Sequence, residues 1–259
     1  MLKNDMVFFT VCYPKALPFL NDFFESLIKQ TDQDFDVLLI NDSCGPMASQ
    51  LDRYKSLRIH ELPVTGSLSK IRQAGFEEVF SKGYEQVIFG DFDDCFLPGR
   101  VAKVRKLLRN WDIVVNDVNL FGDRDENKYF SRRIKDGSQI LLKDILSKNF
   151  MGLSNTAVRA ECLKDITLAD TVAVDWYLFS RLLAQGAKAI FCGEPLTSYR
   201  QHAGNMAILG GDENRKREVK STHYRLLKRD CHELVPMIDR LIESENKDQR
   251  IDFPFWWED

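Results

Sequence analysis

Short apolar segments alternate with amphipathic segments along residues 7–109 of this 259-residue chain. Residues 7–12, 35–40 and 86–90 are mostly apolar, which is typical of strands covered on both faces, and a shorter strand is expected at residues 57–62. The order β-α-β-α-β-α-β-α predicts an α/β fold with a doubly wound, mostly parallel sheet flanked by helices. Apolar side chains recurring every three or four positions predict the helices, at residues 18–30, 68–80 and 98–109.

The remaining sequence is less regular. A strand is expected at residues 112–118, a charged loop or hairpin at 122–136, a helix at 139–147, a mixed segment at 150–158, a helix at 172–185 and a short strand at 188–192. The composition changes after Gly211, where residues 212–247 are charged and compatible with helix. We expect this last part to be a helical appendage to the main domain.

Composition excludes several classes of protein. The charge sum of −3 makes nucleic acid an unexpected partner. The six cysteines are scattered and no secretory leader is recognised, so reduced thiols in the cytoplasm are expected rather than disulfides or structural zinc. No apolar stretch approaches the roughly 18 residues of a membrane span.

Three carboxylates follow the apolar run Val87–Phe89, at Asp91, Asp93 and Asp94. Carboxylates this close at the end of a buried strand repel one another, so a cation is expected among them. Oxygen ligands favour Mg²⁺, Mn²⁺ or Ca²⁺. The alternative is an acidic turn that caps the next helix.

Four segments occur in an order known from one enzyme family. They are Asn41-Asp42-Ser43, the segment from Gly66 to Gly75, Asp91-Phe92-Asp93-Asp94 with Pro98, and Val174-Asp175-Trp176 followed by Tyr199-Arg200-Gln201-His202. They resemble the Asp-Asp-Gly-Ser turn, the Gly-x-x-x-Ala-Arg-Asn-x-Gly helix start, the Asp-x-Asp-Asp-x-x-x-Pro motif, and the Glu-Asp-Trp helix with its Tyr-Arg-x-His tail. These are motifs of GT-A type glycosyltransferases of family 2, and the resemblance extends from Val7 to Asn205.

The resemblance implies a GT-A (Rossmann-like) glycosyltransferase domain over residues 1–211. Residues 1–110 would be its nucleotide-binding half and residues 111–211 its acceptor-binding half, with residues 212–259 a helical C-terminal extension that ends in an aromatic tail. The implied reaction moves a sugar from a nucleotide-sugar donor, with a UDP-sugar expected, to a hydroxyl of a glycan or lipid-linked acceptor. The family implies inversion at the anomeric carbon and a role in polysaccharide biosynthesis.

The resemblance places the donor contacts in the first half of the chain. Asn41 or Asp42 would bind the base, Arg72 the base or diphosphate, and Asp91 the ribose. Asp42 could instead be a turn carboxylate that bonds its own backbone, and Arg72 could lie on a solvated helix face. The full predicted nucleotide-sugar-binding set is Thr10, Tyr13, Asn41, Asp42, Arg72, Asp91 and Phe92.

A divalent metal, Mn²⁺ or Mg²⁺, is the implied cofactor. Departure of a nucleoside diphosphate builds negative charge on phosphate oxygens, which a divalent ion stabilises. The resemblance gives the metal to Asp93 and His202, with Asp94 in support. The alternative for His202 is a hydrogen-bonding role only.

Asp175 is the candidate general base, because an acceptor hydroxyl needs a carboxylate to take its proton as it attacks. Val174 stands where the family usually has Glu, which leaves Asp175 as the only carboxylate of the pair. Asp175 could instead be a carboxylate favoured by the helix dipole. Trp176 could stack on an acceptor sugar or belong to the core.

The C-terminal segment carries a run of basic residues. It could touch anionic lipid or a pyrophosphate-linked acceptor, giving peripheral contact with the inner face of the membrane. Its apolar positions equally fit a helix packed on the main domain, which is the preferred interpretation. The basic residues are Arg215, Lys216, Arg217, Lys220, Arg225, Lys228 and Arg229.

Two other functions stay open at this stage. A catalytically inactive sugar-nucleotide-binding or scaffold protein would explain Val174 and the altered turn after the first strand. A sugar-phosphate nucleotidyltransferase is less favoured, because residues 13–17 after that strand contain no glycine for a phosphate loop.

Overall fold

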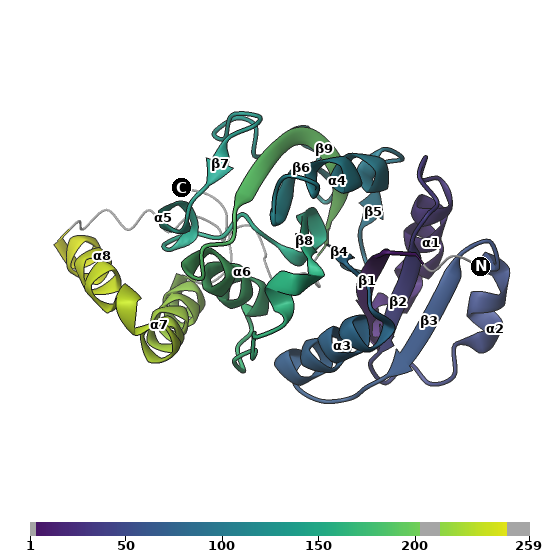
Figure 1. Cartoon of the computed structure of the whole chain (residues 1–259), viewed down its shortest axis with the longest axis horizontal. Coiled ribbons are helices and arrows are strands. Elements are labelled where there is room, and N and C mark those ends of the chain that lie inside the picture. Colours follow the sequence, from purple (N-terminus) through teal and green to yellow (C-terminus); the bar gives the residue numbers. More distant parts are fainter. Residues whose placement is uncertain (1–3, 203–212, 248–259) are drawn as a thin grey trace.

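The computed structural model of the chain describes residues 4–202 and 213–247 (Figure 1). Within these residues one sheet has the strand order β3-β2-β1-β4-β8-β6-β9-β5, and β7 pairs with β9. The strands are β1 (Met6–Cys12), β2 (Asp36–Asn41), β3 (Arg58–Pro63), β4 (Gln86–Phe89), β5 (Cys95–Phe96), β6 (Ile113–Gly122), β7 (Gln139–Ile140), β8 (Thr156–Arg159) and β9 (Ala189–Gln201).

The first half of the sheet is parallel, as the sequence predicted. β1 lies between β2 and β4 and pairs with both in parallel, and β2 pairs in parallel with β3. Strands of this kind bring their carboxyl ends to one edge of the sheet. The polar segments that follow β1, β2 and β4 therefore meet at that edge.

Helices cover both faces of the sheet. The α-helices are α1 (Leu20–Ile28), α2 (Ala48–Leu51), α3 (Leu68–Lys82), α4 (Arg100–Leu107), α5 (Leu142–Ile145), α6 (Val174–Ala184), α7 (Glu213–Asp230) and α8 (Val235–Lys247). Short 3-10 helices are η1 (Pro14–Phe19), η2 (Asp52–Tyr54), η3 (Leu153–Asn155), η4 (Ala160–Leu163) and η5 (His232–Leu234).

Alternate residues of β1 enter two separate hydrophobic cores. Phe8 packs on the side of α1 and α4, where its ring lies 5.9 Å from that of Phe23. Phe9 packs on the other side, in the cluster that holds Ile71 of α3 and Leu178 of α6. Each fully buried side chain of this size stabilises the fold by about 1.5–3 kcal/mol, and the two cores fix the sheet between its helices.

The second half of the sheet is mixed, and several of its elements differ from expectation. β8 is antiparallel to both β4 and β6. The strand expected at 188–192 continues to Gln201 as β9, because β6 pairs with it across a register shift at Asn116 and Asp117. The helix expected at 139–147 was wrong in its first residues, which form β7 and pair with β9, and only α5 is helical.

The segment after β4 contains a short strand that the sequence did not predict. β5 follows the carboxylates directly and pairs with β9 through Cys95 and Ser198. Gly90 lies where this segment leaves β4, and a Cβ there would be 2.4 Å from Phe8 and 2.6 Å from Phe96. The tight turn from β4 into the carboxylates thus depends on the missing side chain at Gly90.

The C-terminal helices pack on the main domain, at the end of the molecule opposite β3 and α2 (Figure 1). Tyr224 and Leu227 of α7 share a cluster with Tyr177 of α6, whose hydroxyl donates to Asp230 at 2.7 Å. α7 therefore packs on the main domain, which was the preferred interpretation of its sequence.

None of the described helices is long and apolar enough to cross a membrane. Contact with a membrane surface and a cytoplasmic location stay predictions, as does the domain boundary at residue 211. That boundary and the aromatic tail lie outside the described residues.

Candidate active site

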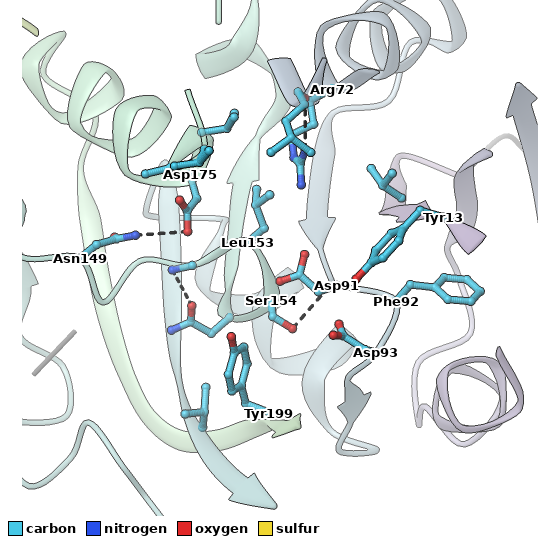
Figure 2. Close-up of a pocket in the computed structure, with 18 of the residues that line it drawn as sticks. Tyr13, Arg72, Asp91, Phe92, Asp93, Asn149, Leu153, Ser154, Asp175 and Tyr199 are labelled. Atoms are coloured by element: carbon cyan, nitrogen blue, oxygen red, sulfur yellow. Dashed lines mark hydrogen bonds between the residues drawn. The ribbon is translucent and has the colours of Figure 1, made fainter. Parts of the chain in front are cut away.

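A cavity of about 520 Å³ lies at the carboxyl ends of β1, β2 and β4 (Figure 2). The start of α3 contributes Arg72, the start of α6 contributes Asp175, and β9 contributes Tyr199. Asp91 and Asp93 also line it. The edge of the sheet where the parallel strands end therefore contains a cavity. Its acidic residues come from the segment after β4 and from α6.

Asp91 to Asp94, called the β4 edge from here on, carry carboxylates with different environments. Asp94 is 1% exposed and accepts hydrogen bonds from the Ser154 hydroxyl and from the Arg200 backbone N–H, the latter at 2.7 Å. Burial and the charges of Asp93 and Asp91 raise the pKa of Asp94 well above its ordinary value. These bonds make Asp94 a support for the turn.

Asp91 faces the cavity. Burial, followed by the negative charge of Asp93, raises the pKa of Asp91 to about 7, although Arg72 and Arg100 act in the opposite direction. Its backbone N–H donates to the Ser154 hydroxyl at 3.4 Å. A hydrogen-bond donor or a cation placed beside this carboxyl would favour its ionised form.

Arg100 lies behind the β4 edge and is fully buried. Its guanidinium donates to the Phe89 carbonyl at 2.7 Å and lies 4.5 Å from the centre of the Phe96 ring. Burial lowers the pKa of Arg100 to about 9, and the charges of Asp94 and Asp91 oppose that shift. The group stays cationic at neutral pH and offsets part of the carboxylate repulsion.

Asp93 and His202 are neighbours, with His202 Nε2 3.0 Å from Asp93 Oδ2. In the described part of the chain, no group of three or more His, Cys, Asp or Glu side chains forms a ready metal site. A carboxylate and an imidazole nonetheless fit Mn²⁺ or Mg²⁺, because such sites are commonly completed by water and substrate phosphates. The two predicted ligands are therefore brought together.

Arg200 holds the β4 edge from the side of β9. Its Nε donates to the Asp93 carbonyl and its terminal nitrogen to the Asp22 carboxylate of α1, each at 2.7 Å. The guanidinium lies 4.7 Å from the ring of Phe19 and 4.4 Å from that of Phe121. This residue ties three parts of the chain together beside the predicted metal ligands.

Arg72 and Tyr13 flank Asp91 in the cavity (Figure 2). Arg72 donates to the Leu68 carbonyl at 3.1 Å, and its Nε is buried without a partner. Burial lowers the pKa of Arg72, against the opposing charges of Asp91 and Asp175. Burial and the nearby Asp93 raise the pKa of Tyr13 to about 12. Arg72 is therefore a cation inside the cavity rather than on a solvated face.

Asp175 lies across the cavity from Tyr13, at what we call the α6 edge, residues 174–176 (Figure 2). The Trp176 backbone N–H donates to one carboxylate oxygen at 2.7 Å, and the Asn149 amide donates to the other at 3.2 Å. Burial raises the pKa of Asp175, while these two bonds and Arg72 lower it. The arrangement is that of a single desolvated carboxylate held in one orientation.

Four predicted site residues do not line the cavity, and one of them is His202, which reaches the site through its contact with Asp93. Thr10 is 1% exposed within β1. Asn41 donates to the Gly45 carbonyl at 2.7 Å and holds the turn after β2. Trp176 is 2% exposed, and its indole N–H donates to the Ile145 carbonyl at 2.6 Å. Its ring therefore belongs to the core, and the expected contact of this ring with an acceptor sugar was wrong.

Two further predicted residues line the cavity in different ways. Asp42 lines it and accepts from the Ser43 hydroxyl at 3.1 Å. Phe92 borders it, but its ring is 1% exposed, points away from the cavity in Figure 2 and stacks on Phe23.

The structure adds cavity residues that were not predicted. Ser154 and Asn149 hold carboxylates, but they lie in an irregular segment without a motif. Tyr199 belongs to the Tyr-Arg-x-His tail, so a signal for it existed. Lys15 of η1 and Arg215 of α7 also line the cavity, and only the basic run of α7 hinted at the second.

The sheet and its acidic edge have the architecture of the GT-A fold. The profile of glycosyl transferase family 2 matches residues 8–166, more than half of the chain. The chain therefore belongs to glycosyl transferase family 2, as the motifs predicted. No curated protein sequence matches it.

Solved structures share the fold. TarS 1–349 of S. aureus in complex with UDP-GlcNAc has a TM-score of 0.65 at 15% identity, over 85% of this chain and 66% of that chain. The mannosyltransferase PcManGT of Pyrobaculum calidifontis, in complex with GDP-Man and Mn²⁺, has a TM-score of 0.63 at 14% identity, over 92% and 69%. GalNAc-T7 with UDP, GalNAc and Mn²⁺ has a TM-score of 0.56 at 12% identity, over 89% and 57%. This chain thus spans about two thirds or less of the TarS structures.

Proposed function

We propose that the chain transfers a sugar from a nucleotide-sugar donor, with a UDP-sugar expected, to a hydroxyl of a glycan or lipid-linked acceptor, with inversion at the anomeric carbon. The observation that carries this proposal is one cavity with Asp91 and Asp93 on one side and Asp175 on the other. The fold likeness to proteins crystallised with UDP-GlcNAc and GDP-Man supports a nucleotide-sugar donor.

The donor would lie along the carboxyl ends of β1, β2 and β4, where ligands of open α/β sheets bind. Tyr13 and Asp42 would face the nucleoside, and Asp91 would accept from the ribose hydroxyls. Arg72 lies beside Asp91 with an unpaired Nε, and its charge would offset that of the diphosphate.

Asp93 and His202 would hold a divalent metal, and Mn²⁺ in the PcManGT and GalNAc-T7 structures supports this choice. The ion supplies charge that stabilises the leaving nucleoside diphosphate. Asp94 keeps the β4 edge in place through Ser154 and Arg200. The chain's own contribution would be to bring Asp93 of the β4 edge and His202 at the end of β9 together, with His202 Nε2 3.0 Å from Asp93 Oδ2.

Asp175 would act as general base. Its carboxylate would take the proton of the acceptor hydroxyl while that oxygen attacks the anomeric carbon on the face opposite the leaving group. The Trp176 N–H and the Asn149 amide orient the carboxylate. Burial raises its pKa and so makes it a better proton acceptor than an exposed aspartate.

Calorimetric titration of UDP, GDP and dTDP, with Mn²⁺ and with chelator, tests the donor site. We expect one nucleotide to bind in a metal-dependent way, and Asp93→Ala to abolish the dependence. Asp123→Ala is the matched control, because Asp123 is exposed and does not line the cavity. Failure of all three nucleotides to bind would contradict the proposed function.

A further inference from the structure

The first turn of α7 forms part of the cavity wall. Arg215 lines the cavity together with Val172, Ala173 and Asp175. α7 begins at Glu213, so this arginine comes from the C-terminal extension and not from the sheet that carries the donor side. The extension is therefore part of the site.

Packing of α7 on α6 fixes where Arg215 lies. Val219 packs against Ala173 and Trp176, and the His223 ring stacks on Trp176 with centres 4.0 Å apart and planes 16° apart. Residues spaced by four lie on one face of a helix, so Arg215 shares the face that carries Val219 and His223. Arg215 therefore lies on the face of α7 that packs against the start of α6, where it lines the cavity with Val172 and Ala173.

The charge of Arg215 has no partner among the described residues, and the side chain is exposed. Two other cations of α7 are paired, Lys228 with Asp239 and Arg229 with Asp230, and Arg225 is unpaired within the part of the chain that the structure describes but lies outside the cavity. Among the described residues, Asp175 accepts hydrogen bonds from the Trp176 N–H and the Asn149 amide and forms no ion pair with Arg215. An unpaired cation in a cavity wall is available to an anionic ligand.

We infer that Arg215 binds an anionic group of the acceptor, a phosphate or a carboxylate, while Asp175 serves the acceptor hydroxyl. The planar guanidinium of arginine matches the oxygens of both groups in a bidentate way. The first turn of a helix adds the favourable end of the helix dipole. Arg72 already lies at the donor side, which leaves Arg215 for the acceptor. The inference rests on the proposed function, because it uses Asp175 to mark the acceptor side.

The test uses the full chain saturated with UDP and Mn²⁺, so that the donor site is filled. Glycerol 3-phosphate and glycerate are titrated as anionic probes and glycerol as the neutral probe, with binding followed by calorimetry and saturation-transfer NMR. We expect Arg215→Ala to weaken binding of an anionic probe by about tenfold or more, with Arg215→Lys in between. Weaker binding of glycerol 3-phosphate would assign a phosphate to Arg215, and weaker binding of glycerate would assign a carboxylate.

Arg225→Ala is the matched control. Arg225 is an exposed arginine of the same helix, has no partner among the described residues and does not line the cavity. We expect this variant to bind the probes like the wild type. Equal binding of the anionic probes by the wild type, Arg215→Ala and Arg225→Ala would overturn the inference.

UDP affinity shows whether the anionic group that Arg215 binds belongs to the acceptor or to the donor diphosphate. If Arg215 serves the acceptor, Arg215→Ala leaves UDP affinity unchanged. A variant that loses UDP affinity but keeps probe binding would assign Arg215 to the donor diphosphate and overturn the inference. A wild type that binds no nucleotide would instead contradict the proposed function, and the same titrations without UDP would still decide whether Arg215 binds the anionic probes.

Discussion

The β4 edge and the α6 edge hold their carboxylates by opposite means. The β4 edge crowds three carboxylates into four residues and needs cations around them, among them the buried Arg100. The α6 edge has one carboxylate, Asp175, oriented by a backbone N–H and by the neutral Asn149. Crowding creates a place that attracts a cation, whereas isolation leaves a carboxylate able to take a proton. The difference predicts that substitutions on the two sides affect different measurements.

Asp175→Asn should have the largest effect. The amide keeps the shape but cannot accept the proton, so we expect kcat to fall by about 10²–10⁴-fold. UDP affinity should stay unchanged, since Asp175 lies at the other edge. Initial rates of UDP release and UDP calorimetry measure the two effects. If this variant lost nucleotide binding but kept its kcat, the division of roles between the two edges would be wrong. If the wild type showed no turnover, the scaffold alternative would be favoured.

Asp94→Ala and Asp93→Ala should separate support from ligand within the β4 edge. Asp94→Ala leaves the Arg200 N–H and the Ser154 hydroxyl without their acceptor, so we expect the free energy of unfolding to fall by about 1–3 kcal/mol. Asp93→Ala should cost less stability and remove metal-dependent nucleotide binding. Urea unfolding followed by far-UV circular dichroism measures the first effect. Equal loss of stability in both variants would contradict this division.

Asn149→Ala should shift the pH dependence of kcat. Asp175 must be ionised to accept a proton, so kcat falls as pH falls through its pKa, which burial has raised. Asn149 donates to the ionised form, and its removal should move the midpoint to higher pH. The profile of kcat against pH is the measurement, with Asn119→Ala as a control outside the cavity.

The same pKa shift has a consequence for stability. Because the folded protein binds this proton more tightly than the unfolded chain, the contribution of Asp175 to stability is present at low pH. It is lost as pH rises through the raised pKa. Unfolding free energies of the wild type and Asp175→Asn should therefore converge at low pH. A gap that does not change with pH would contradict the shift.

His223→Phe should have the smallest effect. Both ring nitrogens of His223 are buried without a partner, and burial lowers its pKa to about 3, so the ring stays neutral at physiological pH. Phenylalanine would keep the stack on Trp176 and remove the unsatisfied nitrogens, which should stabilise the protein by about 0.5–1.5 kcal/mol. Thermal unfolding measures this. Destabilisation would mean that the α6 edge depends on a polar contact after all.

The β4 edge was largely predictable from sequence. Alternating strands and helices are local patterns, and parallel strands must bring their carboxyl ends together, so these patterns alone place Asp91 and Asp93 at one edge of the sheet. The pairing of Asp93 with His202 needed the motif order as well. What local patterns missed was β5 and the full length of β9, because both depend on pairing between distant segments.

The α6 edge was predicted only in part. Asp175 was found through the motif. For Trp176 the sequence left an acceptor contact and a core position open, because the residues that cover its ring lie far away in the sequence. His223 and Ile145, far away in sequence, take up its ring and its N–H. Arg215 was missed as a site residue for the same reason, since the basic run of α7 does not reveal which residue faces the cavity.

Arg200 also bears on how the chain folds during synthesis. It bonds the Asp93 carbonyl, 107 residues earlier, and the Asp22 carboxylate, 178 residues earlier. Contacts of such sequence separation form late, because a long loop must close before they can contribute. When the ribosome has synthesised β4 and the carboxylates that follow it, Arg200 has not yet been synthesised. The nascent chain should therefore complete the proposed donor site only after β9 has emerged, and truncation products that end before β9 should bind the proposed nucleotide donor poorly.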